Sequence, residues 1–158
     1  MLIKGIIAED FINYKKPSMV IEFPYCDFKC DKECGQEVCQ NSSLVKSPTY
    51  DIAIDKIVLF YLKNDITQAV VFQGLEPFDS KEDLYQLIKF IRKYTDDDIV
   101  IYTGYTEEEI ENEVIILKRL FKNIIIKFGR FIPNKPSHYD ATLGVFLASS
   151  NQYAKKIC

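Results

Sequence analysis

Four cysteines stand close together near the start of the chain. Cys26, Cys30, Cys34 and Cys39 fall within fourteen positions, whereas Cys158 is the last residue. Thiolates at such short spacing bind zinc or an iron–sulfur cluster, because both take soft sulfur ligands. A cluster held by only three thiolates keeps one iron open for a small molecule, as catalytic metal sites keep one position free. We therefore expect metal chemistry in this segment.

Two other interpretations of the cysteines stay open on the residues alone. A structural zinc site would use all four as C-x3-C-x3-C-x4-C, although zinc modules favour two short knuckles separated by a longer span. The cysteines could also be ordinary reduced residues. A tight cluster in a reducing compartment nevertheless favours metal or redox chemistry, and an odd total of five fits poorly with a closed disulfide framework.

The length and composition are those of one ordinary soluble domain. The chain has 158 residues, of which 47% are hydrophobic, and 20 Lys and Arg face 23 Asp and Glu for a formal net charge of -3. This balance argues against nucleic-acid binding through a basic face. The longest apolar run has six residues, far fewer than a bilayer requires, and no secretory signal is apparent. We expect a single domain over residues 1–158, in the cytoplasm, with no membrane or nucleic-acid partner.

The elements that must position the cysteines alternate between strand and helix. Short β-branched runs predict strands at residues 18–23, 69–73, 99–103 and 124–128, and three of these, apolar on both faces, are typical of interior strands of a parallel sheet. Apolar residues at helical spacing predict helices over residues 51–62, 81–94 and 107–121. Ser80 with Asp83, and Thr106 with Glu109, have the spacing of capping boxes. Residues 3–8 and 142–148 are candidates for two further strands.

Ligands of parallel α/β sheets bind at the carboxyl ends of the strands. The segments that follow the expected strands are polar or contain glycine, unlike their surroundings. They are residues 25–41, 74–77, 104–105, 129–130 and 149–152. We expect these segments to line one edge of the sheet and to face a common cleft beside the cysteines.

Several of these segments resemble, in order, the motifs of one protein family. Cys26 and Cys30 have the spacing of the first two cysteines in the C-x3-C-x2-C loop of the radical S-adenosylmethionine proteins. GLEP at residues 74–77 resembles the family's GGEP segment, IYTGY at residues 101–105 resembles YTGY, and ASSNQ at residues 148–152 resembles GSSNQ. Within that superfamily the resemblance is to the activating subunit of the anaerobic ribonucleoside-triphosphate reductase, and it covers residues 18–152.

This resemblance implies both a fold and an activity. The fold is α/β: a partial, open βα barrel of parallel strands with outer helices, and with the cysteine loop after the first barrel strand. The activity is that of an oxidoreductase that cleaves S-adenosylmethionine at a 4Fe-4S cluster and generates a glycyl radical on the large subunit of the reductase. The resemblance also implies an external one-electron donor that reduces the cluster. A short, open barrel admits a loop of a protein substrate, or closes by forming a homodimer.

The third cluster ligand is where the sequence departs from the family. The family's third cysteine would fall at residue 33, which is Glu33 here; Cys34 comes one residue late and Cys39 later still. Cys39 is followed two residues on by Asn41, as in the family, and is preceded by Val38, which can pack on adenine. We therefore expect Cys39 to be the third ligand after an insertion, with Cys34 as the alternative.

The resemblance further implies that no catalytic side chain is needed beyond the cluster. The residues that it assigns to cofactor binding are Phe28, Val38, Asn41, Gly74, Leu75, Glu76, Thr103, Gly104, Tyr105, Asn151 and Gln152. Among them, residues 74–76 would contact the methionine amine, and residues 151–152 the adenine edge. Two alternatives remain: a small radical S-adenosylmethionine enzyme that acts on a small molecule, and a non-catalytic, zinc-stabilised α/β interaction domain.

Overall fold

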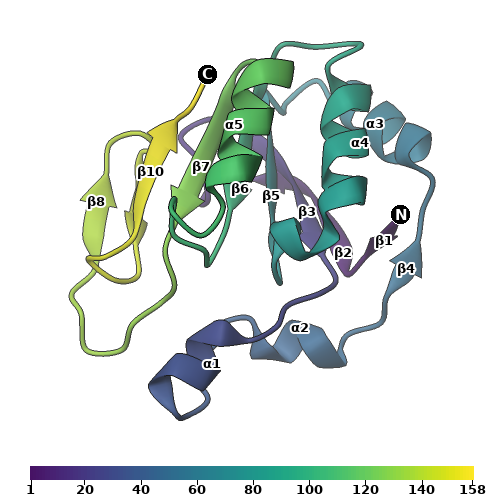
Figure 1. The fold of residues 1–158 in the computed structure, drawn as a ribbon. Coiled ribbons are helices and arrows are strands. Elements are labelled where there is room, and N and C mark those ends of the chain that lie inside the picture. The colour runs from purple at the N-terminus through teal and green to yellow at the C-terminus, as the bar shows by residue number, and fades with distance from the viewer.

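A six-stranded mixed sheet forms the centre of the molecule. The computed structural model describes residues 1–158, and the spatial strand order is β10-β7-β6-β5-β3-β2 (Figure 1). The strands are β2 (Gly5–Asp10), β3 (Ser18–Phe23), β5 (Ala69–Gly74), β6 (Asp98–Tyr102), β7 (Ile124–Phe128) and β10 (Tyr153–Lys156). The central four, β3, β5, β6 and β7, run parallel, while β2 and β10 are antiparallel strands at the two edges. The sheet is therefore open.

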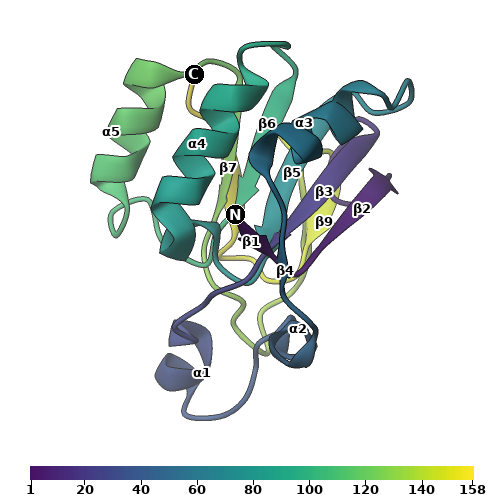
Figure 2. The same cartoon turned by 90° about the vertical axis from the view of Figure 1, so that its right-hand side faces the viewer.

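Three helices cover one face of this sheet. They are α3 (Ile54–Leu62), α4 (Lys81–Ile91) and α5 (Glu111–Leu120), and Figure 2 shows α4 and α5 side by side on that face. In α4 the residues at helical spacing, Leu84, Leu87, Ile88 and Ile91, are all buried. They join a core of 23 buried residues that takes alternate positions of the strands, because successive strand side chains point to opposite faces.

The opposite face of the sheet is covered by irregular chain and a small ribbon. Val20, Val71, Val100 and Ile125 point to this side and form a second buried cluster with Tyr14. The ribbon pairs β8 (His138–Asp140) with β9 (Val145–Leu147) and adds Leu143 and Leu147 to the same cluster. The expected strand over residues 142–148 is thus shorter than expected, and it pairs outside the main sheet.

The four expected strands at residues 18–23, 69–73, 99–103 and 124–128 are confirmed to within one residue at either end. The edges differ. Strand β10 was not expected, because Tyr153–Lys156 is largely polar and an edge strand needs no continuous apolar run. At the N-terminus the single expected strand divides into β1 (Leu2–Ile3), which pairs with β4 (Tyr50–Asp51), and β2. Since β4 takes residues 50–51, helix α3 begins three residues later than expected.

The two expected capping boxes have different outcomes. Thr106 and Glu109 make the two expected hydrogen bonds: the Thr106 amide donates to Glu109 Oε2 at 2.8 Å, and the Glu109 amide donates to Thr106 Oγ1 at 3.3 Å. These bonds close a turn that precedes α5, which begins at Glu111 and not at residue 107 as expected. Ser80 makes no side-chain cap. The 3₁₀ turn Pro77–Ser80 runs directly into α4, so Ser80 lies within continuous helical chain and not at a free helix start.

The segment after β3 carries the cysteines. It contains two short helices, α1 (Lys29–Cys34) and α2 (Ser42–Lys46), which lie apart from the sheet in both views, at the carboxyl ends of the parallel strands (Figures 1 and 2). Neither helix contributes a fully buried residue. None of the helices is long and apolar enough to cross a membrane.

Candidate metal centre

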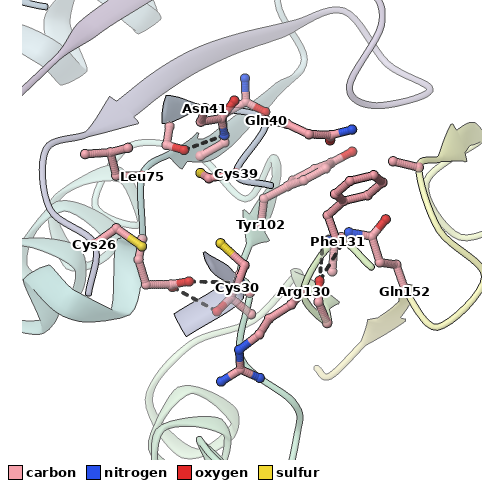
Figure 3. Close-up of a pocket in the computed structure, with 18 of the residues that line it drawn as sticks. Cys26, Cys30, Cys39, Gln40, Asn41, Leu75, Tyr102, Arg130, Phe131 and Gln152 are labelled. Atoms are coloured by element: carbon pink, nitrogen blue, oxygen red, sulfur yellow. Dashed lines mark hydrogen bonds between the residues drawn. The ribbon is translucent and has the colours of Figure 1, made fainter. Parts of the chain in front are cut away.

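A cavity of about 300 Å³ lies at the carboxyl ends of the parallel strands. Cys26, Cys30 and Cys39 line it together with residues from the ends of β5, β6 and β7. Figure 3 shows the three sulfur atoms on the same side of the cavity, facing one another. Cys34, at the end of α1, does not line the cavity. The strand ends and the cysteines therefore share one site, as expected from the sequence.

The backbone beside Cys26 is held in an uncommon conformation. Phe28, which precedes α1, has φ of +54°, a left-handed value that a bulky residue rarely adopts. In this conformation the Phe28 amide donates to Cys26 Sγ at 3.3 Å. A donor aimed at sulfur favours the thiolate over the thiol. Phe28 therefore acts on the site through its backbone, and its side chain does not line the cavity.

Two of the thiols, those of Cys26 and Cys30, hold their protons at neutral pH. Burial raises the pKa of Cys26 to about 11, and burial with the nearby Cys39 and Asp31 raises the pKa of Cys30 to about 12. Metal ligation requires thiolates, so binding of a metal here must displace protons. A soft metal centre that binds thiolates strongly supplies the free energy needed to deprotonate them.

Three hydrogen bonds attach the cysteine segment to the end of β5. The Asn41 amide Nδ2 donates to the Gly74 carbonyl at 2.6 Å, and the Glu76 amide donates to the Tyr25 carbonyl at 2.6 Å. The Asp27 amide donates to Asp79 Oδ2 at 3.1 Å. Asn41 was expected to bind cofactor; its amide group here joins the segment after Cys39 to the strand.

Gly74 allows the end of β5 to lie close against the end of β3. Its φ is +94°, and an added Cβ would lie 2.8 Å from the Phe23 nitrogen and 2.9 Å from Glu22 Cα, both backbone atoms. We expect Gly74→Ala to lower the free energy of unfolding of the apoprotein by at least about 3 kcal/mol, from strain and backbone clash together. Chemical denaturation measures this.

The matched control for that substitution is Gly35→Ala. Gly35 also has a positive φ, +66°, but an added Cβ would meet nothing within 4 Å. Only the left-handed penalty of about 1–2 kcal/mol remains. Equal losses for the two variants would contradict the close-approach argument.

Glu76 is the most connected side chain of the site. It is 4% exposed, its Oε1 accepts from Thr103 Oγ1 at 2.8 Å and from the Phe78 amide at 3.1 Å, and its Oε2 accepts from the Gly104 amide at 2.9 Å. Burial nevertheless raises its pKa to about 7. Thr103 and Gly104, both expected to contact cofactor, are thus also the residues that orient this carboxylate.

Lys127 is a second buried charged residue in the cavity, and the sequence analysis did not select it. Its side chain is 7% exposed, and Nζ donates to the Gly129 carbonyl at 2.8 Å. No carboxylate lies within ion-pair distance, and burial lowers its pKa to about 8 although Glu76 raises it. The available signal was a single lysine inside an otherwise apolar interior strand, IIIKF.

An ion-pair network joins helix α1 to the ends of β6 and β7. Arg130 donates to both oxygens of Glu109, at 2.8 and 2.6 Å, and this contact lowers the pKa of Glu109 to about 2. Lys29 Nζ lies 3.6 Å from Glu109 and 4.5 Å from the centre of the Tyr105 ring. The Tyr105 hydroxyl donates to Asp79 at 2.7 Å. These contacts fix the outer wall of the cavity.

The SSNQ turn differs from its expected role. Asn151 does not line the cavity, and its Nδ2 donates to the Arg130 carbonyl at 2.8 Å. Gln152 does line it, but its side-chain amide bonds Gly129 at 3.2 Å and Ser149 at 3.1 Å. Both amides therefore hold the turn against the end of β7, rather than projecting free donors towards a ligand. Val38 also lies outside the lining, whereas Leu75 is part of it.

The other side of the cavity is an apolar wall that sequence reasoning missed. It comes from the end of β6, from the chain after β2 and β7, and from β9; its members are Ile12, Tyr102, Phe131, Val145, Phe146 and Leu147. Tyr102 is fixed by its hydroxyl, which donates to the Asn13 carbonyl at 2.6 Å. Such residues are separated widely in sequence, so no local pattern marked them as one surface.

The donor set fits an iron–sulfur cluster better than a four-cysteine zinc ion. Ligands of one zinc ion converge on a single point, but the four cysteine sulfurs do not form a group within 4.8 Å of one another. In a 4Fe-4S cluster each thiolate binds a different iron, so three sulfurs that surround a cavity are suitable ligands. Cys26, Cys30 and Cys39 meet that requirement.

Three thiols at the strand ends of an α/β sheet form a site that suits the class of iron–sulfur proteins. Comparison with known families agrees: residues 18–154 match the family model described as 4Fe-4S single cluster domain, and the chain belongs to this family. No curated protein and no solved structure matches the chain.

Proposed function

We propose that this protein is a radical S-adenosylmethionine enzyme that generates a glycyl radical on the large subunit of an anaerobic ribonucleoside-triphosphate reductase. One observation carries the proposal: the three thiols and the segments that resemble the family's motifs line a single cavity. The family match supports the cluster itself. The open sheet, with helices on one face, is suited to the partial barrel that the proposal requires.

Cys26, Cys30 and Cys39 would hold the 4Fe-4S cluster and leave one iron without a protein ligand. When bound, such a cluster supplies the electron that cleaves the sulfonium of S-adenosylmethionine. An external one-electron donor is part of the proposal, as it must reduce the cluster. The role of the chain is to hold the methionine group next to the open iron and to keep water away.

The two buried charges are complementary to a zwitterionic amino-acid group. Glu76 Oε2 accepts one hydrogen bond, from the Gly104 amide, and so keeps a lone pair for an ammonium group. Lys127 uses one of its three donors, on Gly129, and offers the others to a carboxylate. Both face the cavity, and burial strengthens their interaction with a ligand because few water molecules compete.

The rim of the cavity supports a protein substrate over a small molecule. Ile12 is 77% exposed and Phe146 is 73% exposed, and both also line the cavity. Tyr139, itself exposed, packs edge-on against Phe146 with 5.6 Å between ring centres. Exposed apolar and aromatic residues around a site are typical of surfaces that bind another protein.

The decisive experiment combines the reconstituted protein with the large reductase subunit, S-adenosylmethionine and a one-electron reductant, without oxygen. We expect a glycyl doublet in the electron paramagnetic resonance spectrum, and none with Cys30→Ala. Cleavage of S-adenosylmethionine without a doublet would favour the small-molecule enzyme. Zinc in place of iron after reconstitution would favour the non-catalytic interaction domain.

A further inference from the structure

The carboxylate of Asp31 closes the unusual cysteine loop. Asp31 follows Cys30 directly, and its Oδ1 accepts hydrogen bonds from the amides of Val38 and Cys39, both at 2.8 Å. The Cys30 sulfur lies 3.7 Å from the same oxygen. One atom therefore contacts both ends of the segment that separates Cys30 from Cys39.

That segment has little else to hold it in place. Cys30 and Cys39 are separated by residues 31–38, and none of these is fully buried. Helix α1 ends at Cys34, and Gly35, with φ of +66°, lets the chain reverse direction. Without an apolar anchor, the position of Cys39 depends on local hydrogen bonds, of which the two to Asp31 are charge-assisted and hence strong.

The same geometry explains why Cys39, and not Cys34, shares the cavity with Cys30. Cys30 and Cys34 lie four residues apart on α1, but Cys34 does not line the cavity, whereas the reversal after α1 returns the chain so that Cys39 does. The side chains of Cys30 and Cys39 are close enough to interact, and both line the cavity.

We propose that Asp31 is a positioning residue that folds the C-x8-C segment into a closed loop and thereby places the Cys39 thiol next to Cys30 as a cluster ligand. This inference rests on the proposed cluster site, but not on cleavage of S-adenosylmethionine or on the reductase. Asp31 is not itself a ligand, but the eight-residue separation between Cys30 and Cys39 makes a residue of this kind necessary.

The test uses three variants of the full chain. Asp31→Ala removes the acceptor, and Asp31→Asn keeps one oxygen that can accept both amides but removes the charge. Glu37→Ala is the matched control, since Glu37 is an exposed acidic residue of the same loop for which no side-chain hydrogen bond or ion pair is found. We expect Asp31→Ala to weaken iron binding about 10–100-fold at limiting iron, a typical loss when a residue that orients a ligand is removed. We expect Asp31→Asn to recover most of that loss, and Glu37→Ala to bind like the wild type.

A readout on the apoprotein separates this inference from the proposed function. Dibromobimane, which bridges two thiols that lie close together, is expected to link Cys30 to Cys39 in the wild type and in Asp31→Asn, and to lose this preference in Asp31→Ala. Mass spectrometry identifies the linked pair. Equal linking of Cys30 to Cys39 in the wild type and in Asp31→Ala would overturn the inference. A protein that binds a cluster but never forms a glycyl radical would contradict only the proposed function.

Discussion

Cys39→Ala is expected to lose the iron–sulfur cluster, whereas Cys34→Ala is expected to keep it. Cys39 lines the cavity with Cys26 and Cys30, while Cys34 lies outside it at the end of α1. With only two thiolates left in the cavity, we expect bound iron after anaerobic reconstitution to fall to about a tenth of the wild-type amount or less. Iron and sulfide analysis, with the visible absorption of the cluster, measures this.

Both variants should remain folded, because neither cysteine is fully buried. Far-ultraviolet circular dichroism and the thermal midpoint of the apoproteins check that loss of iron is not loss of fold. The opposite result, in which Cys34→Ala loses the cluster and Cys39→Ala retains it, would show that the loop rearranges on metal binding and that Cys34 is the third ligand.

Lys127→Met is expected to weaken binding of S-adenosylmethionine by about 10–100-fold while leaving the fold at least as stable as the wild type. A charge-assisted hydrogen bond contributes about 1.5–3 kcal/mol, which corresponds to this loss of affinity. Methionine fills a similar volume and removes a buried ammonium that has no carboxylate partner, so the apoprotein loses no packing. Equilibrium binding to the reconstituted, unreduced protein measures the affinity.

The pH dependence makes the assignment specific. Because burial lowers the pKa of Lys127 from 10.5 to about 8, the lysine is cationic below about pH 8 and neutral above it. The affinity of the wild type is expected to fall as the pH rises through this value, whereas that of Lys127→Met stays flat. For stability the sign is opposite: the lowered pKa means that the wild type gains stability as the pH rises from about 8 towards 10.5, and this slope is absent in the variant.

Lys4→Met is the matched control. Lys4 is another buried lysine, but it lies outside the cavity, and its Nζ donates to the carbonyls of Val45 and Ser47 at 3.1 and 2.8 Å. We expect this variant to lose about 1–3 kcal/mol of stability and to keep its affinity for S-adenosylmethionine. Wild-type affinity in Lys127→Met between pH 7 and 9 would contradict the role given to Lys127.

The sequence was informative wherever the determining interactions are local. Interior strands carry apolar residues on both faces, so β3, β5, β6 and β7 could be located from short runs. Thr106 and Glu109 made the two expected hydrogen bonds because both partners lie within one turn of chain, although α5 begins only at Glu111. The strand-end segments could be placed in one cleft because parallel strands bring their carboxyl ends to the same edge.

What could not be predicted depends on contacts between distant segments. Lys127 is chemically unusual only because Tyr102 and the ribbon side of the sheet bury it, and no local pattern reports that burial. Asp31 appeared as one acidic residue among several, since its importance depends on where the chain returns after Gly35. The β8–β9 ribbon follows from pairing outside the sheet, which strand propensity does not distinguish from pairing within it.

The order of residues around the cavity has a consequence for how the protein is made. The ligand cysteines lie between residues 26 and 39, whereas Lys127, Arg130 and the ribbon that walls the site come from the last third of the chain. Because synthesis begins at the N-terminus, the three thiols leave the ribosome first and are exposed to solvent and oxygen before the residues that wall the cavity have been made. A cluster inserted during synthesis would lack this wall, so we expect stable loading to follow completion of the chain.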